Sequence, residues 1–188
     1  GVAAAFAVIT AVNTTEKAIP IFLKEAFGKS DYNILGTETY FSEDVYQAAQ
    51  QQLDKATAVA VLKQNTKLHL EQEGIAAIQK RVVLTGYSHL DTPVTDFKVI
   101  EGDLNAGGAI ITDQTARAMK LAVGHTLSFE TDQGIKTIPV TAIVEYTLDL
   151  MGPRNWFMAK YHHWSIALPL TTLQEWFGQS GRIQGVLI

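Results

Sequence analysis

Residues 99–146 read VIEGDLNAGGAIITDQTARAMKLAVGHTLSFETDQGIKTIPVTAIVEY, and the expected fold class rests on them. The glycines and acids at residues 101–108 predict a tight turn, because glycine adopts positive φ at little steric cost. The β-branched run 109–112 predicts a strand, after which Thr112 or Asp113 is placed to cap a helix. We expect Gly124-His125 to end that helix. Residues 126–130 and 135–144 then predict a hairpin around a turn at residues 131–134.

This stretch resembles a known family. Its Gly-acid turn, short apolar strand, helix with an inward Ala, Leu-Ala-Val-Gly-His-Thr-Leu segment (121–127) and Val/Ile-rich hairpin resemble the extracytoplasmic core domain of MacB/FtsX-type ABC transporter permeases. Members of that family usually carry Gly-Asp where this chain has Gly124-His125. The resemblance extends over most of the chain, including the apolar N-terminus and residues 166–188.

The resemblance implies a non-enzymatic part of a transport machine that needs no cofactor. It places the domain on the extracytoplasmic side of a bacterial cell membrane, periplasmic or extracellular, between flanking transmembrane helices. A cytoplasmic ATPase subunit or domain would supply energy through those helices to a permease dimer. Substrates in the family include drugs, peptides, lipoproteins and cell-wall regulators, and no motif in this sequence selects among them.

Composition narrows the partners and the chemistry. The chain has 188 residues, a formal net charge of −4 and no basic run, which argues against nucleic acid, since phosphate binding needs clustered Lys and Arg. It has no cysteine, which excludes disulfides and thiolate metal sites. The length suits one large domain or two small ones.

The N-terminus carries an apolar run, Val2 to Val12, that is shorter than the roughly 20 residues needed to cross a membrane. It fits either the buried half of a soluble helix or the outer end of a transmembrane helix. The resemblance favours a membrane helix that leads straight into an extracytoplasmic one. Pro20 interrupts the amphipathic continuation and is expected to kink it, which would set the bend of a lever.

The remaining strands are predicted from the alternation of apolar and polar residues, and the remaining helices from residues that can cap a helix N-terminus. Strands are predicted at residues 31–35, 58–62, 67–72, 75–87, 164–168 and 182–188, and helices from Ser42 and from Thr171 or Thr172. Short helices among antiparallel strands indicate an α+β fold. We expect two lobes. One is a discontinuous porter-like lobe of residues 1–87 and 159–188, and the other is a smaller α+β lobe inserted at residues 88–158.

No catalytic motif is present: the sequence lacks Gly-x-Ser-x-Gly, His-Glu-x-x-His and a phosphate-binding glycine loop. His162-His163 is the best candidate for a metal site, but neighbours in a strand point to opposite faces, so we assign neither metal nor catalytic residues. Four acids are close in sequence: Asp91, Asp96, Glu101 and Asp103. Hydrogen bonds from turn amides to their carboxylates are enough to explain acids at these positions, without a catalytic role.

A Met/Trp/Phe-rich loop is a stronger functional candidate than the histidine pair or the acids. Met151, Trp156, Phe157 and Met158 either pack on the core or contact a partner. The alternative functions are a free extracellular ligand-binding or sensor module that uses this loop, and a small hydrolase built on the acid cluster.

Overall fold

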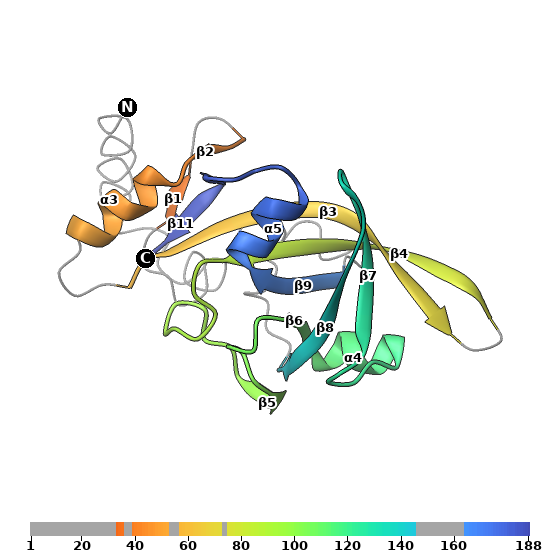
Figure 1. Cartoon of the computed structure of the whole chain (residues 1–188). Helices are drawn as coiled ribbons and strands as arrows, with labels where there is room; N and C mark the ends of the chain where they lie inside the picture. Colours follow the sequence, from red (N-terminus) through yellow and green to blue (C-terminus); the bar gives the residue numbers. More distant parts are fainter. Residues whose placement is uncertain (1–32, 36–38, 53–56, 73–74, 146–163) are drawn as a thin grey trace, which may run out of the picture.

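The computed structural model of the chain describes residues 33–35, 39–52, 57–72, 75–145 and 164–188. The described elements alternate short helices with strands of very different lengths (Figure 1). In chain order they are β1 (Asn33–Leu35), β2 (Phe41–Ser42), α3 (Asp44–Gln52), β3 (Val59–Gln72), β4 (Ile75–Tyr87), β5 (Val99–Gly102), β6 (Ala109–Thr112), α4 (Asp113–Met119), β7 (Thr126–Thr131), β8 (Gly134–Val144), β9 (Trp164–Pro169), α5 (Leu170–Trp176), β10 (Arg182–Ile183) and β11 (Gly185–Leu187).

One large sheet organises the described residues, which confirms the α+β class. Its strands follow the order β1-β11-β3-β4-β9-β6-β8-β5, and β7 pairs with both β3 and β8. The sequence predicted antiparallel strands throughout, but β4 with β9 and β6 with β8 are parallel. Parallel neighbours need a crossover connection, which α4 and β7 supply between β6 and β8.

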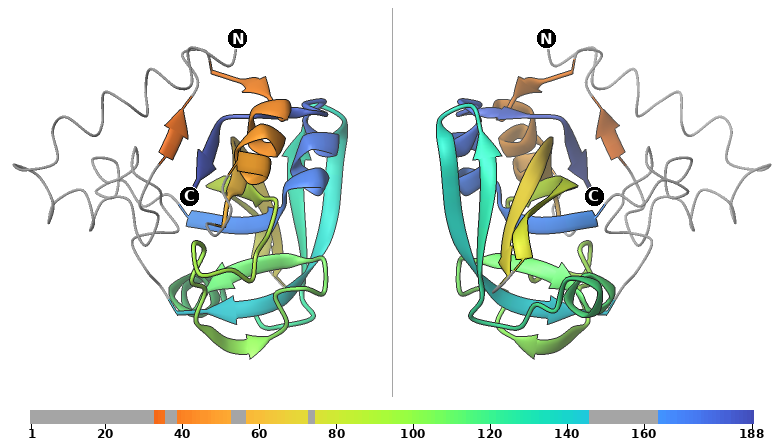
Figure 2. Two further views of the ribbon diagram at one scale, coloured as in Figure 1. Left: turned by 90° about the vertical axis from the view of Figure 1, so that its left-hand side faces the viewer. Right: turned by 90° about the vertical axis from the view of Figure 1, so that its right-hand side faces the viewer.

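The stretch 99–146 folds largely as its residues predict. Ala109–Thr112 forms β6, and Thr112 caps α4 by accepting a hydrogen bond at Oγ1 from the Thr115 N–H (3.1 Å). The hairpin β7–β8 closes with Thr131 opposite Gly134. Figure 2 shows this hairpin in cyan, bending along one side of the molecule from α5 towards β5.

Two boundaries in this stretch were predicted wrongly. Helix α4 ends at Met119 rather than at Gly124-His125, because Lys120 adopts a left-handed conformation (φ 54°) and its N–H closes on the Ala116 carbonyl. Gly124 (φ 90°) makes a separate turn, where its N–H donates to the Val140 carbonyl. Glu101 and Gly102, predicted as the start of a tight turn, instead belong to the strand β5, which pairs with β8.

Three further boundaries differ from prediction. The strands predicted at 58–62 and 67–72 are one strand, β3, because the polar run between them stays paired with β4. The predicted strand 182–188 is divided at Gln184, which bonds to β3 at both its N–H and its Oε1 (2.8 Å each). Helix α5 begins at Leu170, so Thr171 and Thr172 lie inside its first turn and do not cap it.

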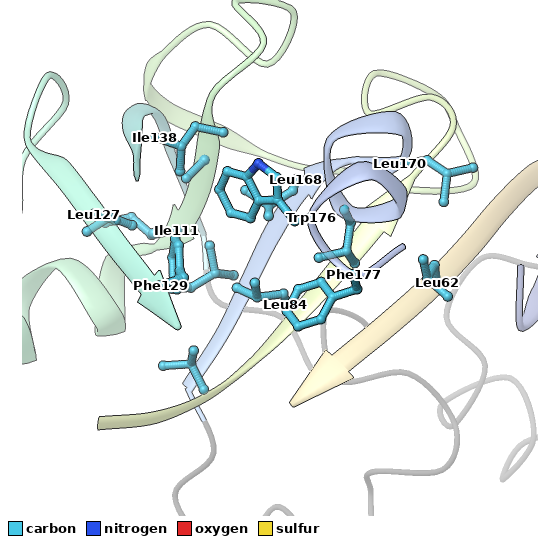
Figure 3. Close-up of a cluster of buried hydrophobic side chains, with 14 of the residues drawn as sticks. Leu62, Leu84, Ile111, Leu127, Phe129, Ile138, Leu168, Leu170, Trp176 and Phe177 are labelled. Carbon is cyan, nitrogen blue, oxygen red and sulfur yellow. The ribbon is translucent and has the colours of Figure 1, made fainter. Parts of the chain in front are cut away.

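The main core lies between the sheet and α5. Trp176 and Phe177 at the end of α5 reach in among side chains of β3, β4, β7, β8 and β9 (Figure 3). Trp176 packs on Phe129, with ring centroids 6.0 Å apart. Gly86 of β4 allows α5 to lie this close, since a Cβ there would be 3.0 Å from the Leu170 Cα and 3.1 Å from the Leu173 Cβ.

The strands of both expected lobes lie on the same sheet path, with β9 next to β6. The division into residues 1–87 with 159–188 and residues 88–158 stays a prediction. Among the described residues, no helix has the length and apolar character that crossing a bilayer requires.

We expect Thr112→Ala to lower the free energy of unfolding by about 0.5–2 kcal/mol, because the cap of α4 is lost and the buried Thr115 hydroxyl loses its partner. Chemical denaturation of the chain measures this. Thr112→Ser keeps the hydroxyl and should lose clearly less. An equal loss in both variants would show that the methyl group, not the cap, matters.

Candidate functional site

Several residues singled out in the sequence lie outside the described residues. They are Pro20, the partner-contact candidates Met151, Trp156, Phe157 and Met158, and His162-His163. The roles predicted for them stay predictions.

Among the acids and histidines considered for chemistry, Asp103 and His125 make hydrogen bonds within their own turns. Asp103 accepts a hydrogen bond from the Asn105 N–H at 2.8 Å, as expected for a turn acid. His125 accepts from the Ala122 N–H within its own turn, and His69 lies on β3 with Nε2 3.8 Å from the Glu130 carboxylate. In the described part of the chain, no group of three or more His, Cys, Asp or Glu side chains could hold a metal ion.

The sequence predicted that segments from both ends of the chain form one lobe, but it did not predict which strands pair there. Strand β11 pairs with β1, with Asn33 opposite Leu187, and β10 pairs with β2, with Ser42 opposite Arg182. We call β1, β2, β10 and β11 the base. Figure 1 shows β1 and β11 side by side. No local pattern indicates these pairings, since they join residues more than a hundred positions apart.

Polar contacts join α5, the strand β10 and the residue that precedes α3. Gln174 of α5 is buried, and its Nε2 donates to the Glu43 carboxylate and to the Arg182 carbonyl, both at 3.1 Å. The Glu43 N–H donates to the Gly181 carbonyl at 2.9 Å. Buried polar groups that are fully paired fix a single arrangement. The segment before α3 and the segment after α5 are therefore held as one unit.

The described residues line two open depressions. One, of about 670 Å³, runs along the base and is lined by residues 39–42 and 180–182. The other, of about 540 Å³, lies between β3, β4 and β7 and contains the ion pair of Lys67 with Glu130 (3.2 Å). Both charge signs line the second depression, which gives it no clear ligand preference.

Known structures share this fold. The chain is similar to the extracellular domain of the noncanonic ABC-type transporter YknZ from Gram-positive bacteria, with 14% identity over 79% of this chain and 72% of that one, and a TM-score of 0.54. It is similar to the periplasmic region of MacB from Actinobacillus actinomycetemcomitans, with 11% identity over 90% and 78% of the two chains, and a TM-score of 0.63. A domain assigned to a permease protein of Porphyromonas gingivalis matches with 16% identity over 80% and 63%, and a TM-score of 0.54.

No protein-family model and no curated protein matches the chain. The structural matches establish the fold class. The described residues have the fold of the extracytoplasmic domains of MacB- and YknZ-like ABC transporter permeases. At the level of fold, this confirms the resemblance found in residues 99–146.

We expect Gln174→Met to lower the free energy of unfolding by about 1–3 kcal/mol, because the Glu43 carboxylate and the Arg182 carbonyl lose a hydrogen-bond donor. Thermal or urea unfolding measures the change. Gln47→Met, at an exposed position of α3, is the matched control and should change little. Equal stability of the Gln174→Met variant and the parent would contradict the role of this contact.

Proposed function

We propose that this chain is the extracytoplasmic domain of an ABC transporter permease, which passes the energy of cytoplasmic ATP hydrolysis to transport or mechanical work outside the membrane. The observation that carries the proposal is the match with the MacB periplasmic region over 90% of this chain. The matched domains of YknZ and MacB come from transporters of this class.

The geometry of the base supports this function. Because β1 and β11 are antiparallel neighbours, the chain enters at residue 33 beside the point where it leaves at residue 187. Membrane segments on either side of the domain would thus leave it from one edge. A displacement of those segments acts on a single unit, and rigid-body movement is a recurrent way of transmitting a conformational change.

The energy source lies in a partner under this proposal. The sequence has no phosphate-binding glycine loop, so a cytoplasmic ATPase subunit or domain would hydrolyse the nucleotide. The permease would act as a dimer in a bacterial cell membrane. Pro20 would bend the lever that joins the membrane helix to the domain, and the loop with Met151, Trp156, Phe157 and Met158 would contact a further partner.

We expect the full-length polypeptide to fractionate with membranes, to co-purify with an ATPase, and to be cut within residues 33–188 by protease added outside the cell. Immunoblotting of fractions and spheroplasts measures this. A cytoplasmic protein of the same cells is the control and should stay intact. Recovery of the chain as a free secreted protein would support the ligand-binding module instead.

We expect a disulfide between cysteines at positions 33 and 187, which are paired in β1 and β11, to leave transport-coupled ATP hydrolysis unchanged, because under this proposal the base moves as one unit. The measurement compares the oxidised Asn33→Cys/Leu187→Cys permease with the same protein after reduction. The variant Ser42→Cys/Arg182→Cys provides a second disulfide, between β2 and β10. If both disulfides abolish transport-coupled ATP hydrolysis and a reductant restores it, the base opens during coupling. The proposal that the domain moves as a rigid body would then be wrong.

A further inference from the structure

Strand β5 leaves one edge of the large sheet unpaired. It is the last strand in the order β6-β8-β5, and within the described residues no strand lies outside it (Figure 1). All four residues are exposed, including Val99 (46%) and Ile100 (60%), which are two of the three large apolar side chains exposed in the described part. An edge strand presents unpaired main-chain N–H and C=O groups, which can pair with a strand of another chain.

A bulge in β5 sets which side chains share a face. Val99 lies opposite Val144 and Glu101 opposite Ile143, so Ile100 is the extra residue. Neighbouring residues of β8 point to opposite faces, and Val99 and Glu101 therefore do so as well. Lys98 precedes Val99, so it shares the face of Glu101. In a regular strand, two residues three positions apart would lie on opposite faces.

This arrangement makes the sequence Lys98-Val99-Ile100-Glu101 complementary to itself. A second β5 placed antiparallel, with a two-fold axis between Val99 and Ile100, sets Lys98 opposite the partner's Glu101. It also sets Val99 opposite the partner's Ile100. Opposite residues of an antiparallel pair share a face, and opposite charges there are favourable. The bulge is what allows Lys98 and Glu101 to meet this condition.

We propose that the outer edge of β5 is the contact between the extracytoplasmic domains of two copies of this chain. The inference rests on the proposed function, in which two permease chains lie in one membrane. A closed two-fold contact uses the same patch on both copies, as the charge pattern requires.

The β5 contact is small, and it depends on both chains being anchored in the same membrane. Four residues bury too little area for a stable dimer of free domains. Anchoring both chains in one membrane assembly raises their effective concentration and makes the contact intramolecular in effect. The ion pair of Lys98 with Glu145 (3.8 Å) competes weakly, because both side chains are more than half exposed. We therefore do not expect the β5 contact alone to hold two copies together once the chain is freed from the membrane.

The test uses the full-length permease in its native membrane, in an otherwise cysteine-free background. One copy carries Val99→Cys with one tag, and the other carries Ile100→Cys with a second tag. Oxidation is expected to give a mixed disulfide that isolates with both tags and disappears on reduction. Ile135→Cys in both copies is the control, since Ile135 is equally exposed (56%) but lies on β8 beside the β7–β8 turn. Absence of the mixed disulfide, or an equal yield from Ile135→Cys, overturns the proposal.

Charge reversal tests the register. Lys98→Glu or Glu101→Lys in both copies is expected to lower the mixed disulfide by about three- to tenfold, because two ion pairs become like-charge pairs. The double variant Lys98→Glu/Glu101→Lys restores the pairs and should restore the yield, although position 98 still faces Glu145 with the wrong sign. Failure of the double variant to recover overturns the register.

These results separate the two proposals. If the permease sits in the membrane with its ATPase but gives no mixed disulfide, the β5 contact is wrong and the proposed function stands. If the chain is not in a membrane, the proposed function fails and the contact between tethered copies fails with it.

Discussion

The structure depends on the position of β11 between β1 and β3. Its three residues pair with β1 on one side and with the start of β3 on the other. Val186 and Ile183 are fully buried, and Gln184 between them bonds to β3 through both its main chain and its side chain. The last strand of the chain thus closes the first strand onto the long β3–β4 hairpin. Without β11, β1 would have no neighbour in the sheet, since it pairs with no other described strand.

This constraint connects the fold with the proposed work of the domain. The base gathers both ends of the described chain, and β3 and β4 extend from it as the longest pair in the described part. Strand β7 crosses to β3 and returns through β8 to β5, so the far edge of the sheet is linked to the hairpin by hydrogen-bonded neighbours (Figure 2). Packed interiors transmit displacement because they deform little. Under the proposed function, a movement applied at the base would be passed to β5, where two copies would meet under the further inference.

Local signals in the sequence predicted local structure well. The Thr112 cap, the strand 109–112 and the turn that ends at Gly134 depend on residues a few positions apart, and the structure confirms each of them. The pairings of β1 with β11 and β2 with β10 could not be predicted, because nothing within either segment specifies a partner so distant along the chain. The polar run 63–66 was misread for a related reason, since its place within β3 comes from pairing with β4. The residues predicted for the candidate site stay predictions. The loop at 151–158 and Pro20 lie outside the described residues, and the base carries no motif.

Native-state hydrogen exchange of the β11 amides tests the central claim most directly. If β11 is an integral part of the sheet, its amides exchange with the same free energy as those of Leu62 and Leu84 in the core, because only global unfolding releases them. Exchange of the β11 amides through local opening, at a free energy close to zero, would contradict the claim, because the two ends of the domain would then not be held as one unit.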